Sequence, residues 1–260
     1  MTVDLFLISY NKAQWLREGI ENALKQNDVR VVVIDNASSD NSVAIAREYP
    51  IEVWAEEKNL GFIEAAKKAI RASKADYLMI CSSEDPLVPG IFAQMLAEFK
   101  KDDELEVVGT DYEIIDADGG HLRRYHCTYG PELYFYDSMP GHFLIKREAF
   151  KKVMWREVVI DGKNGYFDWD FWLQCLHQGT RVKVINKIGF KYRQHSSLTS
   201  DANIIRKKFK KKLREDFEKN AGKRILILLK MFFLNPQSMI MVAKESILKL
   251  GRVLGIIKFY

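Results

Sequence analysis

The sequence predicts an α/β fold in which a mostly parallel central sheet is flanked by helices. Short apolar runs alternate with segments of helical periodicity through the first hundred residues. Polar or acidic residues follow three of these runs directly, after Ile8, Ile34 and Cys81. Crossover helices join parallel strands in such folds, and ligands bind beyond the carboxyl ends of the strands.

Four strands are predicted before residue 100, because each is a short apolar run bounded by polar or turn residues. Residues 3–8 are apolar apart from Asp4, and residues 31–34 are all β-branched. The other two runs are residues 51–54 and 77–81.

Helices are predicted between these strands. Apolar residues recur at helical spacing across residues 12–26. A second helix, at about 40–48, follows serine and aspartate residues suited to N-capping, namely Ser38, Ser39 and Asp40. Two more are predicted at 61–73 and, after Pro86 and Pro89, through Leu96 and Phe99.

Residues 105–200 are less regular and are predicted to add mixed strands to the sheet. The expected strands are 107–108, 112–115, 181–185 and 189–193; the expected helices are 147–153 and about 168–178, with a turn at Asp118-Gly119-Gly120.

Charge is unevenly distributed along the chain. Residues 1–200 contain 25 Lys or Arg and 30 Asp or Glu, whereas residues 201–260 contain 15 and 5. A protein that binds nucleic acid usually carries its basic surface on the folded domain, so we expect no nucleic-acid partner.

Cysteine usage and the N-terminus predict a cytoplasmic protein. Cys81, Cys127 and Cys175 are an odd number without a C-x-x-C pair, which is typical of reduced, mostly buried thiols. Asp4 interrupts the first apolar run and no basic segment precedes it, so a signal peptide is not predicted.

Residues 201–260 are predicted to form a basic amphipathic helical tail. Basic residues cluster within 204–224, and two apolar helical segments follow, separated by Asn235-Pro236. Neither reaches the ~20 uninterrupted apolar residues that span a bilayer. We expect residues 203–260 to bind an anionic membrane surface, on the inner face of the cell membrane. The alternative is a helical extension that packs on the body or forms a homodimer.

Six motifs of the sequence are Ile8-Ser9-Tyr10-Asn11-Lys12, residues 33–42, Asn59-Leu60-Gly61-Phe62, residues 141–147, residues 168–173 and Tyr192-Arg193-Gln194-His195. Their order and spacing resemble those of glycosyltransferase family 2, which has the GT-A fold. The sequence resembles this family over residues 3–200. The resemblance implies an inverting transferase with a nucleotide-sugar-binding half at 1–104 and an acceptor half at 105–200, followed by the tail at 201–260.

The resemblance places the nucleotide-sugar donor, most often a UDP-sugar, on residues that follow the strands. The carboxylate of Asp35 would accept hydrogen bonds from a uracil-type base or ribose; the alternative is a turn or helix-capping residue. The ring of Tyr10 would stack on the base, unless it is an ordinary half-buried aromatic. The remaining donor-binding candidates are Ser9, Asn11, Asn59, Gly61, Ser83 and Arg193, the last for diphosphate oxygens.

A metal site is expected at Ser82-Ser83-Glu84-Asp85, where the family has its D-x-D motif. Ser82 replaces the first aspartate, which leaves Glu84 and Asp85, with His195 from the last motif, as ligands of Mn²⁺ or Mg²⁺. Such an ion would neutralise the departing diphosphate. The alternative is an N-capping cluster for the helix after Pro89.

Asp168 is expected to be the catalytic base, because inverting transfer needs a carboxylate that takes the proton of the acceptor hydroxyl. Phe167 stands where the family has a glutamate. Asp170 would point elsewhere on the helix as a cap or orienting group. The acceptor-binding candidates are Trp169, Asp170 and His142, and core packing is the alternative for at least one of Trp169 and Trp172.

The sequence thus predicts a hexosyltransferase of cell-surface glycan synthesis, such as lipopolysaccharide or capsule, acting on a glycan or lipid-linked glycan. The alternative, suggested by Ser82 and Phe167, is a catalytically impaired module that binds nucleotide-sugar or glycan. A nucleotidyltransferase would need a Gly-rich phosphate loop after the first strand, and none is found there.

Overall fold

The computed structural model describes residues 1–195 except 131–132, 134–136, 161–162 and 165. The predicted tail, and with it the membrane and homodimer predictions, lies outside the described residues. Within the described part, none of the helices combines the length and apolarity needed to cross a membrane.

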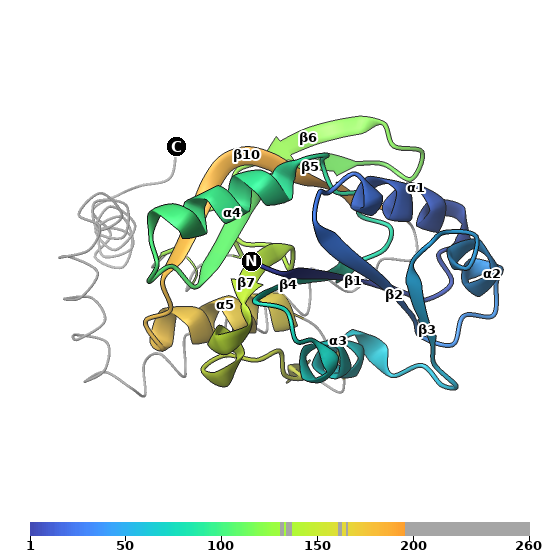
Figure 1. Ribbon diagram of the computed structural model, residues 1–260, viewed down its shortest axis with the longest axis horizontal. Coiled ribbons are helices and arrows are strands. Elements are labelled where there is room, and N and C mark those ends of the chain that lie inside the picture. Colours follow the sequence, from blue (N-terminus) through green and yellow to red (C-terminus); the bar gives the residue numbers. More distant parts are fainter. Residues whose placement is uncertain (131–132, 134–136, 161–162, 165, 196–260) are drawn as a thin grey trace, which may run out of the picture.

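Eight strands form one sheet in the order β10-β5-β7-β4-β1-β2-β3, and β6 pairs with β5 (Figure 1). All neighbours run parallel except β7, which is antiparallel to both β4 and β5, and β6, which is antiparallel to β5. The strands are β1 (Val3–Ser9), β2 (Val29–Asp35), β3 (Glu52–Ala55), β4 (Tyr77–Ser82), β5 (Val107–Ile115), β6 (His121–Tyr125), β7 (Phe143–Lys146) and β10 (Val182–Arg193). A separate hairpin contains β8 (Val159–Ile160) and β9 (Lys163–Asn164).

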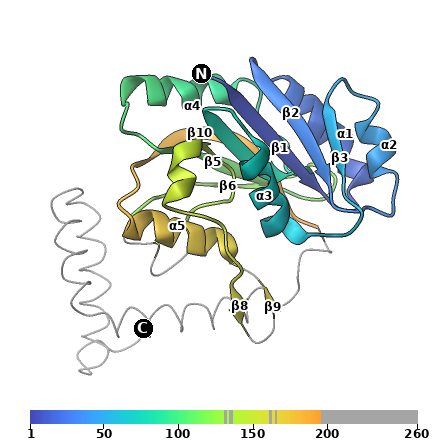
Figure 2. The same cartoon turned by 60° about the horizontal axis from the view of Figure 1, so that its bottom comes forward.

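Helices cover both faces of the sheet, as the two views in Figures 1 and 2 show. The faces are set by the two-residue period of the strands. Leu5 and Leu7 of β1 pack in the same cluster as apolar residues of α1 (Ala13–Leu24), α2 (Ser42–Ala46) and α4 (Ile91–Lys101). Phe6 and Ile8 point the other way, into the cluster under α3 (Gly61–Ala72) and α5 (Phe167–His177).

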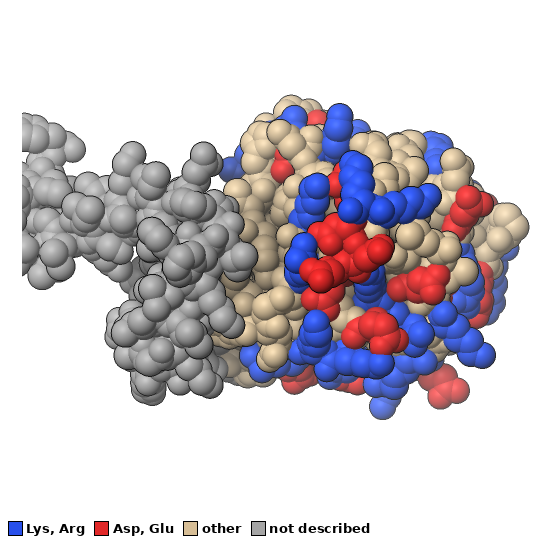
Figure 3. Space-filling model, turned by 60° about the vertical axis from the view of Figure 1, so that its left-hand side comes forward, with Lys and Arg blue, Asp and Glu red and all other residues tan. Residues whose placement is uncertain are grey.

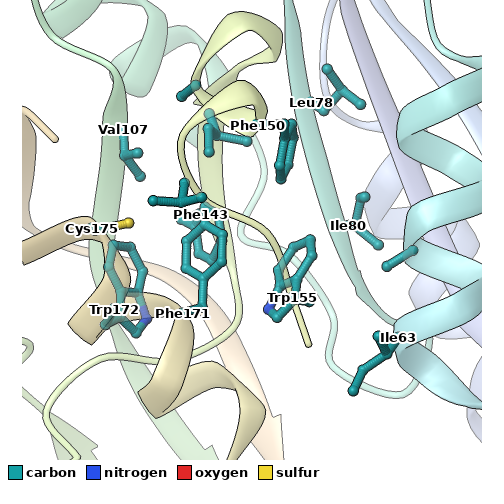
Figure 4. Close-up of a cluster of buried hydrophobic side chains, with 14 of the residues drawn as sticks. Ile63, Leu78, Ile80, Val107, Phe143, Phe150, Trp155, Phe171, Trp172 and Cys175 are labelled. Atoms are coloured by element: carbon teal, nitrogen blue, oxygen red, sulfur yellow. The ribbon is translucent and has the colours of Figure 1, made fainter. Parts of the chain in front are cut away.

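The core on the α5 side is aromatic. Phe143 of β7 stacks on Phe171 of α5 with ring centroids 4.8 Å apart, and meets Trp172 edge-on at 4.7 Å (Figure 4). Trp155 stacks on Phe171 at 5.0 Å and also lies 5.4 Å from Phe143. These rings fix the position of α5 relative to the sheet.

The second half of the chain joins the same sheet as the first. The two strands predicted at 107–108 and 112–115 are one strand, β5. Likewise 181–185 and 189–193 merge into β10, which pairs with β5 through register shifts around Ile188. The helix predicted at 147–153 is a short 3₁₀ helix, Arg147–Lys151.

One face of the described body carries acidic side chains flanked by basic ones (Figure 3). Where α4 ends and β10 begins, Arg181 pairs with Asp102 and Glu104, both at 2.7 Å. Lys183 pairs with Glu98 at 2.5 Å. Exposed pairs of this kind contribute little to stability, typically below about 1 kcal/mol each.

Candidate active site

Several of the predicted site residues lie at the edge of the sheet where β1, β2, β4 and β10 end and β7 begins. Ser9 lies beside Asp35 in the register of β1 and β2, and Ile8 lies beside Ser82 in that of β1 and β4. The chain stays paired just past the strands, because Ser83 N–H donates to the Ile8 carbonyl at 3.0 Å. Three of the predicted motifs therefore meet at one edge.

Asp35 is buried, and its carboxylate organises the loop that follows β2. Its two oxygens accept hydrogen bonds from Ser38, at 2.8 Å from the backbone N–H and 2.6 Å from the hydroxyl. This is the turn role that the sequence left open for Asp35. A carboxylate has about four lone-pair sites, so these bonds leave capacity for a further donor.

Asn11 ties the loop after β1 to the loop after β2. Its backbone N–H donates to Ser38 Oγ at 2.9 Å, and its side-chain oxygen accepts from Ser39 N–H at 2.8 Å. Asn11 adopts a left-handed conformation, with φ of 53°, which asparagine tolerates better than most residues. Of the three side chains predicted to cap α2, Ser38 and Ser39 engage this loop instead. Asp40 Oδ1 accepts the backbone N–H of Ser42, the first residue of α2, at 3.0 Å, and the N-cap residue itself is Asn41.

Tyr10 projects from the same loop and is 45% exposed, so its ring is open to a stacking partner. Ser9 and Ser83 are fully buried, and their hydroxyls have no hydrogen-bond partner among the described residues.

Asn59 lies just before α3, where its side-chain oxygen accepts a hydrogen bond from Gly61 N–H at 2.8 Å. Gly61 has φ of 71°, a conformation that favours glycine.

Glu84 forms an ion pair with Lys12, a residue that was not among the predicted site residues. Lys12 Nζ is 3.0 Å from Glu84 Oε1 and 3.2 Å from His195 Nε2, and it lies 5.3 Å from the centre of the Trp15 ring. The imidazole of His195 also packs on Trp15, with centroids 4.6 Å apart. The structure therefore brings Glu84 and His195 together as predicted, around an ammonium group.

Asp85 turns inward from the same loop. Its Oδ1 accepts the backbone N–H of Arg193 at 2.8 Å, and its Oδ2 lies 3.4 Å from Nε2 of His142. Burial, followed by the charge of Glu84, raises the pKa of Asp85 well above its usual range. Burial also lowers the pKa of His142 to about 3, so this imidazole is neutral, stacked on Phe190 at 4.0 Å. His142 thus packs against the loop of Asp85.

The side chains expected to ligate Mn²⁺ or Mg²⁺ are engaged with other groups of the chain. Ser82 donates its hydroxyl to Glu84 Oε2 at 2.7 Å, so both oxygens of Glu84 are held by groups of the chain itself. Across the part of the chain that the structure describes, no three His, Cys, Asp or Glu side chains are grouped so as to hold a metal. The segment Ser82-Ser83-Glu84-Asp85 does not cap α4 either, because the N-cap residue of that helix is Gly90.

Arg193 is buried and its guanidinium is committed to acceptors of the protein. It donates to Glu18 Oε2 at 2.5 Å, to the Ala117 carbonyl at 2.9 Å and to the Glu84 carbonyl at 3.1 Å. These bonds join the end of β10 to α1, to the turn after β5 and to the loop after β4. The guanidinium predicted to hold diphosphate oxygens is therefore arranged to position the loop that carries Glu84.

Asp168, the proposed base, lies in the first turn of α5 and is partly buried. Its Oδ1 accepts the indole N–H of Trp155 at 3.1 Å. Burial raises the pKa of Asp168 to about 7, and the bond from Trp155 opposes that rise. A Cβ on Gly141 would lie 2.7 Å from Asp168 Oδ1, so the lack of a side chain there lets the carboxyl group approach.

Asp170 faces away from Asp168, as predicted from helical spacing. Arg156 binds it with two hydrogen bonds of 2.6 and 2.7 Å, and Gln174 adds a third of 2.8 Å. Trp169 is not at an acceptor surface: its ring is fully buried and its N–H donates to the Leu133 carbonyl at 2.5 Å. Trp172 is also fully buried, so both tryptophans belong to the core.

Two further residues that pack near the start of α5 were not among the predicted site residues. Trp155 holds the carboxylate of Asp168, and Phe62, from the start of α3, stacks on Phe167 at 5.2 Å and meets Trp155 edge-on at 5.8 Å. Phe62 belongs to the motif Asn59-Leu60-Gly61-Phe62, so the sequence could have indicated it. Trp155 lies outside all six motifs, and no pattern in the sequence indicates it.

The sheet order and the side chains at its carboxyl edge define an α/β protein of the GT-A type, as the resemblance implied. The chain belongs to glycosyl transferase family 2, whose family model matches residues 4–156.

Proteins from several microorganisms are similar in sequence to this chain. An uncharacterized glycosyltransferase of Methanocaldococcus jannaschii is 22% identical over 211 residues, which cover 74% of this chain and 70% of the relative. The succinoglycan biosynthesis protein ExoU of Rhizobium meliloti is 24% identical over 213 residues, covering 72% and 60%.

The fold is also that of S. aureus TarS. The structure of its residues 1–349 in complex with UDP-GlcNAc has a TM-score of 0.61 and 15% identity. The match covers 76% of this chain and 60% of that TarS chain, and at this identity it shows the fold alone.

Proposed function

We propose that this transferase moves a sugar from a UDP-sugar to an acceptor hydroxyl with inversion, and that Asp168 is the base. The observation that carries the proposal is the carboxyl group of Asp168, partly buried at the start of α5 with its pKa raised to about 7. A base with a pKa near the working pH combines the ionised form with enough basicity to take a proton.

The reaction balances with this single base. Asp168 takes the proton of the acceptor hydroxyl as its oxygen attacks the anomeric carbon. The bond between that carbon and the diphosphate oxygen breaks on the opposite face, and its electron pair leaves with UDP. One displacement of this kind inverts the anomeric configuration.

Contacts at the other end of the edge support a nucleotide donor. Asp35 retains acceptor capacity for the base or ribose, and the exposed ring of Tyr10 offers a stacking surface. Asn11 holds the two loops that carry these residues in one arrangement. TarS, which shares this fold, has been seen in complex with both UDP and UDP-GlcNAc.

For the acceptor we propose a glycan or lipid-linked glycan of the cell surface, reached from the cytoplasmic face of the membrane. The basic residues within 204–224 and the apolar segments after them support attachment to anionic lipid. Sedimentation with anionic liposomes that is reversed by salt, and is lost when residues 203–260 are deleted, is the expected result. Sedimentation that survives the deletion would contradict it.

The proposed base is tested by Asp168→Asn in the purified full chain. We expect the variant to fold and to bind UDP, while transfer falls by about 10²-fold or more. Asp170→Asn is the matched control on the same helix, since its carboxylate binds Arg156 and Gln174. Unchanged turnover in Asp168→Asn would remove the assignment. UDP binding without turnover by the wild type, across a panel of donors and acceptors, would favour the binding module.

A further inference from the structure

We propose that the ammonium group of Lys12 supplies the positive charge for the donor diphosphate, where the family resemblance predicts a divalent cation. The proposal rests on the function proposed above and names a further residue of the same site. It follows that transfer proceeds without added metal.

The position of Lys12 is the first argument. The amino group lies between Glu84 Oε1 and His195 Nε2, the two side chains expected to ligate a metal, at 3.0 and 3.2 Å. The Lys12 side chain is only 16% exposed, and the Trp15 ring lies 5.3 Å from its charge. A cation is therefore already held where these ligands meet.

The ligand chemistry is the second argument. Mg²⁺ and Mn²⁺ are usually held by one or two carboxylates together with phosphate oxygens. Here the first aspartate of the motif is Ser82, and its hydroxyl occupies the second oxygen of Glu84. An ammonium group has three N–H donors, and the contacts to Glu84 and His195 use two. One donor remains for a phosphate oxygen.

The third argument is that Lys12 lies between the proposed nucleoside-binding residues and the proposed base along this edge of the sheet. Asn11, next to Lys12, is bonded to Ser38, which binds Asp35 at the nucleoside end. In the other direction Glu84 is followed by Asp85, whose Oδ2 lies 3.4 Å from His142, the neighbour of Gly141 beside Asp168. A diphosphate joins the nucleoside to the transferred sugar, so it must cross the interval in which Lys12 lies.

The role of Lys12 is electrostatic. As the bond from the anomeric carbon breaks, negative charge builds on the departing diphosphate oxygen. A Lys12 N–H donates a hydrogen bond toward that charge, without transferring its proton, while Asp168 holds the proton of the acceptor. A fixed donor at a developing oxyanion typically contributes about 10²- to 10³-fold to kcat.

The test compares four proteins, each stripped of metal and assayed in EDTA: the wild type, Lys12→Met, Lys12→Arg and Lys68→Met. Lys68 is a matched control, because its amino group also pairs with a carboxylate, Glu56 at 2.5 Å, and lies 5.7 Å from a tryptophan ring, Trp54. We measure transfer, and by calorimetry the affinities for UDP and uridine. Lys12→Met combined with Glu84→Gln removes both charges, should the single variant fail to fold.

We expect the wild type and Lys68→Met to transfer sugar in EDTA. Lys12→Met should lose about 10²-fold in kcat and bind UDP about tenfold more weakly, with uridine affinity unchanged. Lys12→Arg should restore most of the UDP affinity. A selective loss of UDP over uridine affinity supports the role of Lys12 even if no acceptor is found.

Two results would overturn the proposal. One of them leaves the proposed transferase function intact, and the other contradicts that function as well. Transfer abolished by EDTA and restored by Mn²⁺, with Lys12→Met matching the wild type, would establish a metal site and leave the proposed function standing. A wild type that binds no UDP and transfers no sugar, with or without Mn²⁺, would remove both.

Discussion

Trp155 donates its indole N–H to Oδ1 of Asp168 at 3.1 Å, so a residue outside every motif controls the proposed base. Burial favours the protonated carboxyl group, whereas this hydrogen bond favours the carboxylate. The balance between the two leaves the pKa near 7. The charge of the base is therefore set by its surroundings in the fold.

The wild-type kcat/KM is expected to rise with pH through about 7, because Asp168 must lose its proton before it can act as a base. Stability should show the opposite trend. The pKa of Asp168 is higher in the folded than in the unfolded protein, so its contribution is fully present below pH 3.8 and is lost as the pH rises through about 7. Rate profiles and thermal melts across this range test both trends, and Asp168→Asn should flatten them. An acid limb near pH 4 would contradict the first.

Trp155→Phe removes the hydrogen bond that favours the ionised form of Asp168. A hydrogen bond to a charged group typically contributes about 1.5–3 kcal/mol, so the acid limb of the rate profile should move up by about one pH unit or more. Trp169→Phe is the control on α5, because its indole donates to the Leu133 carbonyl. It should lower stability and leave the limb in place. Equal shifts in both variants would point to a general loosening of the core.

Much of this fold follows from local patterns. The β-branched run at 31–34 and the apolar run at 3–8 became neighbouring parallel strands, and their two-residue period assigned each side chain to one face. The placement of β7 between β4 and β5 did not follow, because it depends on pairings such as Leu78 with Ile145. No short window of sequence contains both partners of such a pair.

The site divides in the same way. Asp35 and Asp168 could be selected as candidates from the sequence alone. Asp35 ends a predicted strand and Asp168 begins a predicted helix, and each lies within a motif. Lys12 belongs to the first motif, but no function was predicted for it. Its position in the site depends on contacts with Glu84 and His195, which are far away in the sequence. The acceptor-binding role predicted for Trp169 did not hold, because an aromatic residue next to the proposed base looks the same in sequence whether it faces solvent or the core.

Arg193→Lys should destabilise the protein. A lysine cannot reproduce the fork that reaches Glu18, Ala117 and the Glu84 carbonyl together, and the Glu84 carbonyl would lose its donor in buried surroundings. We expect the free energy of unfolding to fall by about 2–4 kcal/mol. Arg181→Lys is the comparison: its guanidinium likewise bonds more than one acceptor, the carboxylates of Asp102 and Glu104, but the side chain is 53% exposed, so the change should stay within about 1 kcal/mol. Urea denaturation of both variants measures the difference, and equal midpoints would contradict the positioning role.

Gly141→Ala should impair catalysis without unfolding the protein. The added methyl carbon would lie 2.7 Å from Oδ1 and 2.9 Å from Oδ2 of Asp168, closer than carbon and oxygen approach without bonding. The carboxylate must move away, and a displacement of about 1 Å from the productive position can cost about 10²-fold in rate. Gly109→Ala is the control, since its nearest neighbour is the flexible end of Met139 at 2.9 Å, which can give way. Steady-state kinetics beside thermal melts separates the two variants. If Gly141→Ala kept the wild-type kcat while Gly109→Ala lost it, the carboxylate of Asp168 would not be the group whose position limits transfer.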